Sequence, residues 1–140
     1  MQHLKGAALP DVHEWDSREW WAHIKQHHLV VQRCTACGTF RHPPMPVCHV
    51  CRSFEYEWSP VSGKGVVFTY IIAHHPPSPA YEDQVPYNVV LVELPDAGNV
   101  RMVGNLLDCP PEKVRIGMAV EAVFEDINDE VTLVQWRVSE

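Results

Sequence analysis

The chain has 140 residues, of which 46% are hydrophobic and 21% charged, and its formal net charge is −7. This length suits one modest domain or one domain with a small appendage, and the composition excludes extensive disorder. No apolar run reaches the roughly 18 residues of a membrane-spanning helix, and the first residues lack the apolar stretch of a secretory signal. A cytoplasmic location is therefore expected.

The N-terminal part is expected to form a loosely held arm over residues 1–15 and a helix over 16–28. Asp16 can cap this helix, and Glu19 stands three residues later in the capping-box position. A short β-prone stretch follows over 29–32.

Trp20 and Trp21 give the predicted helix a wide aromatic stripe. This stripe either packs on the rest of the chain or docks onto another subunit, since tryptophan is enriched at buried interface anchors. The sequence leaves both interpretations open.

Four of the five cysteines form two Cys-x-x-Cys pairs, Cys34 with Cys37 and Cys48 with Cys51. The segment that contains them is rich in turn-forming residues and has little apolar material to bury. Four thiolates at this spacing predict a structural zinc ribbon, whose metal supplies folding energy and has no open position for a substrate. Rubredoxin-type iron and a redox dithiol are the alternatives.

The other residues that could bind a metal or act as a nucleophile are expected to have no functional role. His42 and His49 are expected to be solvent-facing loop residues, because four cysteines already complete a metal site. Cys109 is the one spare thiol, and most lone cysteines are inert.

The remainder of the chain is expected to be β-structure, which makes the fold class mainly β. Five short β-branched segments are separated by Pro, Gly, Asn and Asp, and a short helix is expected over 108–115 between the third and fourth. This order is typical of a five-stranded OB-fold barrel. The predicted strands are 66–73, 87–94, 100–106, 118–125 and 131–138.

The predicted organisation therefore has three parts. The arm and helix occupy 1–28, the zinc ribbon 29–58 and the OB-fold 59–140. A proline-rich loop over 74–86 joins the first two strands of the barrel, where OB-folds commonly carry a binding loop.

Several motifs in this order resemble the acyl-CoA-associated OB-fold family with a rubredoxin-like zinc ribbon. The resemblance covers about 15–138 and implies an accessory subunit of a thiolase-fold enzyme, such as a thiolase, an acyltransferase or a sterol side-chain aldolase. It also implies that the partner holds the catalytic residues, while this chain supports the binding or transfer of acyl-CoA. The motifs are the Trp-bearing helix, the two cysteine pairs with Pro43-Pro44 between them, Ser62-Gly63-Lys64-Gly65-Val66-Val67, Pro86-Tyr87-Asn88-Val89-Val90-Leu91-Val92-Glu93-Leu94, Ile116-Gly117-Met118-Ala119-Val120 and Phe124-Glu125-Asp126.

Basic residues gather at the predicted ribbon, where Arg33, Arg41 and Arg52 lie in a stretch without acidic residues. They either offset the charge of −2 on a zinc tetrathiolate or contact CoA phosphates or an acidic patch on the partner. His74 and His75 can likewise meet a substrate or a partner's active site, or simply cap a strand.

Two other functional classes compete with the accessory subunit. Zinc ribbons and OB-folds also occur in nucleic-acid-binding proteins, which carry aromatic residues interleaved with lysine and arginine on the second and third strands. The acidic net charge disfavours this alternative, and so do these strands, since the second has no lysine or arginine and the third has only Arg101. A free-standing enzyme is also disfavoured, because no nucleophile, base and orienting group stand out together.

Overall fold

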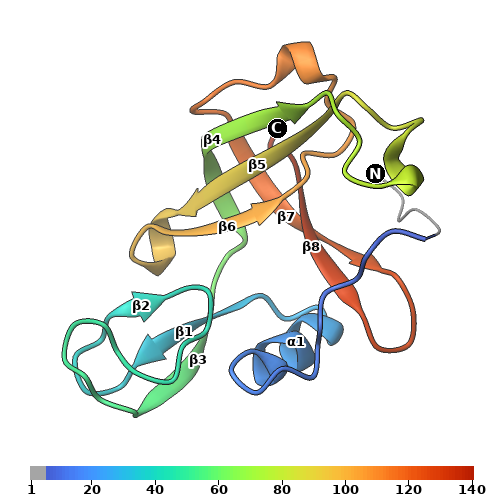
Figure 1. The fold of residues 1–140 in the computed structure, drawn as a ribbon. Coiled ribbons are helices and arrows are strands. Elements are labelled where there is room, and N and C mark those ends of the chain that lie inside the picture. The colour runs from blue at the N-terminus through green and yellow to red at the C-terminus, as the bar shows by residue number, and fades with distance from the viewer. Residues whose placement is uncertain (1–5) are drawn as a thin grey trace.

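The computed structural model describes residues 6–140 and shows a small ribbon sheet, one α-helix and a curled five-stranded sheet (Figure 1). The ribbon sheet and the curled sheet form two lobes, and the helix lies beside the ribbon. The helix and strands are α1 (Arg18–Lys25), β1 (Val30–Cys34), β2 (Phe40–Arg41), β3 (Tyr56–Pro60), β4 (Lys64–Ala73), β5 (Tyr87–Leu94), β6 (Val100–Gly104), β7 (Ala119–Asp126) and β8 (Thr132–Val138).

Helix α1 is shorter than the sequence predicted, and the proposed capping box is wrong. The helix starts after Ser17 without a side-chain cap, so Asp16 is not the N-cap. The Glu19 carboxylate does not turn back to the helix start but accepts hydrogen bonds from the Tyr56 hydroxyl and the Trp58 indole, both on β3. A side chain that the local pattern assigns to capping is therefore used to join the helix to the ribbon.

The ribbon sheet has the strand order β2-β1-β3 with antiparallel pairing throughout. Its central strand β1 matches the β-prone stretch predicted over 29–32. The last strand, β3, extends to Pro60 and so crosses the boundary that the sequence predicted between residues 58 and 59.

The larger sheet has the order β6-β5-β4-β7-β8, which is the predicted OB-fold. Along β5 the side chains alternate strictly between half-buried and buried, as expected for a strand with one face on a core. The sheet curls so that the segment after β6 meets β8, where the Leu107 backbone N–H donates to the Trp136 carbonyl at 2.7 Å. All five predicted barrel strands are present.

The short helix predicted over 108–115 is wrong. The structure has only a single 3₁₀ turn there, Pro111–Lys113. Asp108 has a φ of 54°, and Pro110 is extended with a ψ of 146°, so neither starts a helix. A proline disfavours the helical conformation of the residue before it, and two consecutive prolines therefore delay the helix until too few residues remain.

The helix, ribbon and barrel share one hydrophobic core. Trp136 is fully buried at its centre, and a Cβ added to Gly104 would lie 2.8 Å from the Trp136 ring. Ile24 of α1 and Val31 of β1 are also fully buried in this cluster. The barrel therefore packs against the other two parts through apolar contacts.

The predicted N-terminal arm is only partly visible, because residues 1–5 lie outside the described part of the chain. Residues 6–15 contain no helix or strand, and Ala8, Pro10 and Glu14 line a groove described below. Among the described residues, no helix has the length and apolar character needed to cross a membrane.

Candidate functional site

The four paired cysteines come together at one end of the ribbon and form a metal site. Their sulfur atoms all lie within 4.8 Å of one another, with Cys34 Sγ 3.5 Å from Cys51 Sγ and Cys37 Sγ 3.6 Å from Cys48 Sγ. A tetrahedron with metal–sulfur bonds of about 2.3 Å has sulfur–sulfur edges of about 3.8 Å. The donor set and its spacing therefore fit a tetrahedral thiolate-bound metal.

Hydrogen bonds to sulfur favour the ionised form of Cys34, Cys37 and Cys48. The N–H of Cys37 lowers the pKa of Cys34, the Thr39 hydroxyl lowers the pKa of Cys37, and the N–H of Cys51 lowers the pKa of Cys48. At Cys51 the N–H of Ser53 acts in the same direction, but loss of hydration and the three neighbouring sulfurs outweigh it and raise the pKa to about 12. A fourth thiolate thus needs a cation among the sulfurs, which a bound metal ion supplies.

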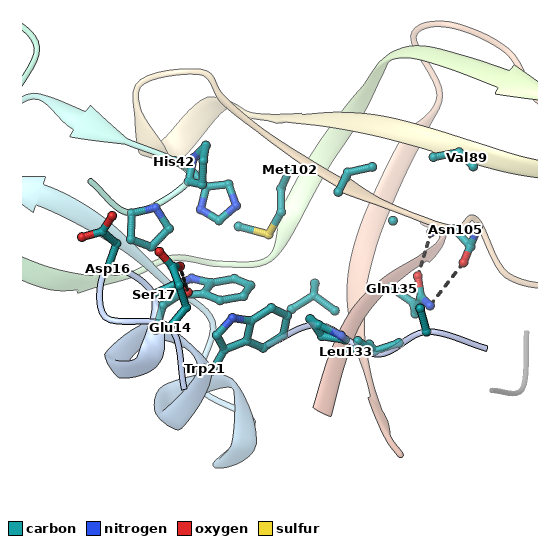
Figure 2. Close-up of a pocket in the computed structure, with 18 of the residues that line it drawn as sticks. Glu14, Asp16, Ser17, Trp21, His42, Val89, Met102, Asn105, Leu133 and Gln135 are labelled. Carbon is teal, nitrogen blue, oxygen red and sulfur yellow. Dashed lines mark hydrogen bonds between the residues drawn. The ribbon is translucent and has the colours of Figure 1, made fainter. Parts of the chain in front are cut away.

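A groove of about 730 Å³ opens where the arm, α1, the ribbon and the barrel meet (Figure 2). This volume lies within the range of small-molecule sites, which is about 300–1,000 Å³. Apolar and aromatic side chains from all four parts line it. They include Trp20, Trp21, Pro43, Pro44, Met45, Tyr81, Tyr87, Val89, Met102, Val103, Leu133 and Val134.

Polar groups occupy the two ends of this groove (Figure 2). The carboxylates of Glu14 and Asp16 lie at one end, and the amides of Asn105 and Gln135 lie at the other. No lysine or arginine lines the groove among the described residues. The groove therefore suits an apolar group and not a phosphate, which binds to cationic side chains.

His42 lies in the groove, and its predicted role as a solvent-facing loop residue is wrong. Its ring centroid is 5.2 Å from that of Trp20, and burial lowers its pKa to about 4. Its Nδ1 is buried without a hydrogen-bond partner. Glu14, Asp16 and Ser17 line the same groove, but the Ser17 hydroxyl donates to Glu14 Oε2 at 2.9 Å and makes no hydrogen bond with the His42 ring. His49, by contrast, is exposed as predicted.

The two tryptophans have different environments, which the sequence left open. Trp20 is 5% exposed, and its Nε1 donates to the Val30 carbonyl at 2.9 Å, so it is a core residue. Trp21 is half-buried, packs edge-on against Trp20 and lines the groove. Packing thus accounts for Trp20, while Trp21 contributes surface to a cavity.

The three ribbon arginines do not gather at the groove. Arg41 is 5% exposed and its guanidinium lies over the Tyr56 ring at 5.8 Å, so it has no surface for CoA or a partner in this structure. Arg33 donates from Nε to the Gly38 carbonyl and stacks on Phe40. Arg52 is exposed and donates to the His49 carbonyl.

The remaining candidates are separate from the groove. His74 and His75 are exposed at the end of β4 and do not line the groove. Cys109 is half-buried in a second depression beside Pro110, and burial raises its pKa. A raised pKa keeps the Cys109 thiol protonated near neutral pH, where it is a weak nucleophile.

The chain matches two adjoining family models. The model for the ChsH2 rubredoxin-like zinc ribbon domain matches residues 21–57, and the model for the ChsH2 C-terminal OB-fold domain matches residues 58–125. A DUF35 domain-containing scaffold protein of Methanocaldococcus jannaschii is 42% identical over 112 residues, which cover 79% of this chain and 77% of that protein. The chain belongs to the DUF35 family.

Two further relatives are named as parts of enzymes. A probable enoyl-CoA hydratase alpha subunit of Thermomonospora curvata is 45% identical over 122 residues, but the chain spans only 37% of its length. A chain of the solved structure titled Ltp2-ChsH2(DUF35) aldolase is 43% identical, with a TM-score of 0.82 over 92% of this chain and 98% of that one. The zinc ribbon and OB-fold of this chain are therefore family features.

Sequence reasoning found the cysteines but missed the groove. Tyr81, Tyr87, Met102 and Leu133 come from separate parts of the barrel and gather only after folding. The one local signal was Trp21, a large aromatic residue at the edge of the helical stripe. The pattern within one helix marks Trp21 as a large aromatic residue, but it does not show which distant segments face the Trp21 side chain.

Proposed function

We propose that this DUF35 chain is a non-catalytic accessory subunit of an acyl-CoA enzyme complex, with a thiolase-fold enzyme as its partner. The observation that carries the proposal is the groove, which is lined mainly by apolar side chains and has the size of a ligand site. The names of the relatives as a scaffold, a hydratase subunit and part of an aldolase support an association with an enzyme.

In this proposal the groove receives the apolar acyl portion of the thioester. The Trp21 and Met102 side chains supply apolar contact, while Asn105 and Gln135 are hydrogen-bonded to each other and close the polar end of the groove. The CoA phosphates are held by the partner, because the groove ends in two carboxylates and has no cation among its lining residues.

The metal in the proposal is zinc, and its role is structural. Zinc is the usual occupant of a tetrahedral site with four thiolates, and four protein ligands leave no position for substrate. Cys34, Cys37, Cys48 and Cys51 would hold it and fix the three strands of the ribbon against α1.

Affinity purification of the tagged chain from its native cells, with mass spectrometry and metal analysis of the product, tests the association. A stoichiometric thiolase-fold enzyme and one zinc per chain are expected. Recovery of the chain alone, or with nucleic acid, would contradict the proposal.

Titration of the purified complex with a long-chain acyl-CoA and with free CoA tests the groove. Trp21→Ala should weaken acyl-CoA binding about tenfold and leave free CoA binding unchanged, because only the acyl portion contacts the groove. The matched control is Trp15→Ala, since Trp15 is 71% exposed and is not a groove-lining residue. Equal losses for both ligands would show that the groove is not the acyl site.

A further inference from the structure

The outer surface of β4, β5 and β6 is apolar where a solvated sheet face should be polar. Ile71 is 63% exposed, Val103 is 60% exposed and Phe68 is 40% exposed. The strand register places Leu91 directly opposite both Thr69 and Val103, and so gathers these residues on one face. We define the outer face as Phe68, Thr69, Ile71, Leu91 and Val103 together with Glu93 and Arg101.

The two charged residues of the outer face are paired with each other. Arg101 Nε lies 3.5 Å from Glu93 Oε2, and the Arg101 guanidinium carbon lies 3.6 Å from the centre of the Phe68 ring. The face therefore carries no net charge. Strands two and three of an OB-fold are its common ligand-binding face, but nucleic acid binds there through free cations and aromatic platforms.

The outer face is continuous with the groove. Val103 belongs to both surfaces, and Val89, opposite Ile71 in the register, also lines the groove. A protein that covers the outer face would therefore also lie along one side of the groove.

Charge distinguishes between the possible protein occupants. Two copies of a chain with a net charge of −7 repel each other, which disfavours self-association. Beside the groove, Glu14 is exposed, and Glu82 and Asp83 follow the groove residue Tyr81 and are exposed too. This surface complements a partner that is apolar at its centre and basic towards the groove.

We propose that the enzyme subunit of the complex docks on the outer face and places its basic CoA-binding residues at the end of the groove that carries Glu14 and Asp16. This inference rests on the proposed function, because it takes from there that the partner is an enzyme that binds CoA. It adds the surface by which the two proteins meet and the charge that the partner presents.

The test uses the enzyme subunit that co-purifies with the wild-type chain, which is isolated and titrated with purified variants. Ile71→Glu and Val103→Glu each introduce a charge at an exposed position, so the fold should survive and the melting temperature should stay near that of the wild type. Each should raise the dissociation constant for the enzyme subunit by about tenfold or more. Higher salt should also weaken wild-type binding, because it screens the attraction between basic residues of the partner and the carboxylates at one end of the groove.

The matched control is Ile116→Glu, because Ile116 is 67% exposed and lies in the connection before β7, outside the outer face. Its binding should stay within about twofold of wild type. If the enzyme subunit binds all three variants equally, the outer-face inference fails while the accessory role stands. A wild-type dimer that Ile71→Glu separates would also overturn it in favour of a second copy, and if no enzyme co-purifies, both proposals fail.

Discussion

At the scale of single residues, the metal site and the groove depend on different kinds of side chain. The four cysteines make their contribution through sulfur atoms within 4.8 Å of one another, so each is essential to the site. His42 contributes by remaining uncharged in an apolar setting, since burial lowers its pKa to about 4. These roles lead to one prediction for a metal ligand and one for a buried base.

Replacing Cys48 with Ser should remove the metal and destabilise the ribbon. Cys48 is fully buried, and a serine oxygen is a poor substitute for a thiolate ligand. We expect the bound metal to be lost and the free energy of unfolding to fall by roughly 4 kcal/mol. Metal analysis and denaturant unfolding measure both effects, with Cys109→Ser as the control. A Cys48→Ser protein that retains its metal and its stability would disprove the structural role.

His42 should make the folded chain less stable in mild acid. The unfolded chain binds a proton near pH 6.5, whereas the folded chain binds it only near pH 4. Stability is therefore complete above pH 6.5 and is lost as the pH falls towards 4, by up to roughly 3 kcal/mol. Denaturant unfolding across this range should show a shallower loss for His42→Gln than for wild type. The control is His49→Gln, because His49 is exposed. If stability falls with pH equally in wild type and in both variants, His42 is not the cause.

At the scale of elements, α1 is held mainly by its partners and only in part by its own sequence. It has eight residues, no side-chain cap and one carboxylate, Glu19, bonded to β3. A helix this short is marginal in water without tertiary packing. Trp20 and Ile24 supply that packing on the core side, and Trp21 faces the groove.

Alanine substitutions at the two tryptophans should lower the free energy of unfolding by different amounts. Trp20→Ala removes a buried side chain and a hydrogen bond to Val30, and should cost roughly 3–5 kcal/mol of stability. Trp21→Ala should cost less than half as much, because Trp21 is only half-buried. Thermal unfolding of both variants is the measurement. Equal destabilisation would mean that Trp21 also belongs to the core.

The sequence predicted the elements whose pattern is local and missed those that depend on distant contacts. The alternation along β5 and the spacing of the four cysteines are local, and both predictions agree with the structure. The two-residue strand β2 exists only because it pairs with β1, so no periodicity marks it. The predicted capping box of Asp16 and Glu19 is wrong for the same reason, because the Glu19 carboxylate accepts a hydrogen bond from Tyr56 on β3 and does not turn back to the helix start.

At the scale of the whole molecule, the ribbon and the barrel are separate sheets but share a core. Leu29, Val30 and Val31 from the start of the ribbon pack in one cluster with Val67 and Trp136 of the barrel. The groove lies at the same junction, so its shape depends on both sheets and on α1. The four cysteines lie on the same ribbon as these core residues, so we expect loss of the metal that they would hold to affect the whole cluster.

Removal of the metal should destabilise the ribbon and the barrel together. Without it the ribbon has little apolar material to hold its loops, and β1 takes its buried residues out of the shared core when it unfolds. We expect chelation to lower the melting temperature while unfolding remains a single transition. Hydrogen exchange measured on peptides from β1–β3 and from β4–β8 distinguishes the alternatives. Equal loss of protection in both sets supports one cooperative unit, whereas a barrel that stays protected after chelation would show that the OB-fold is stable without the ribbon.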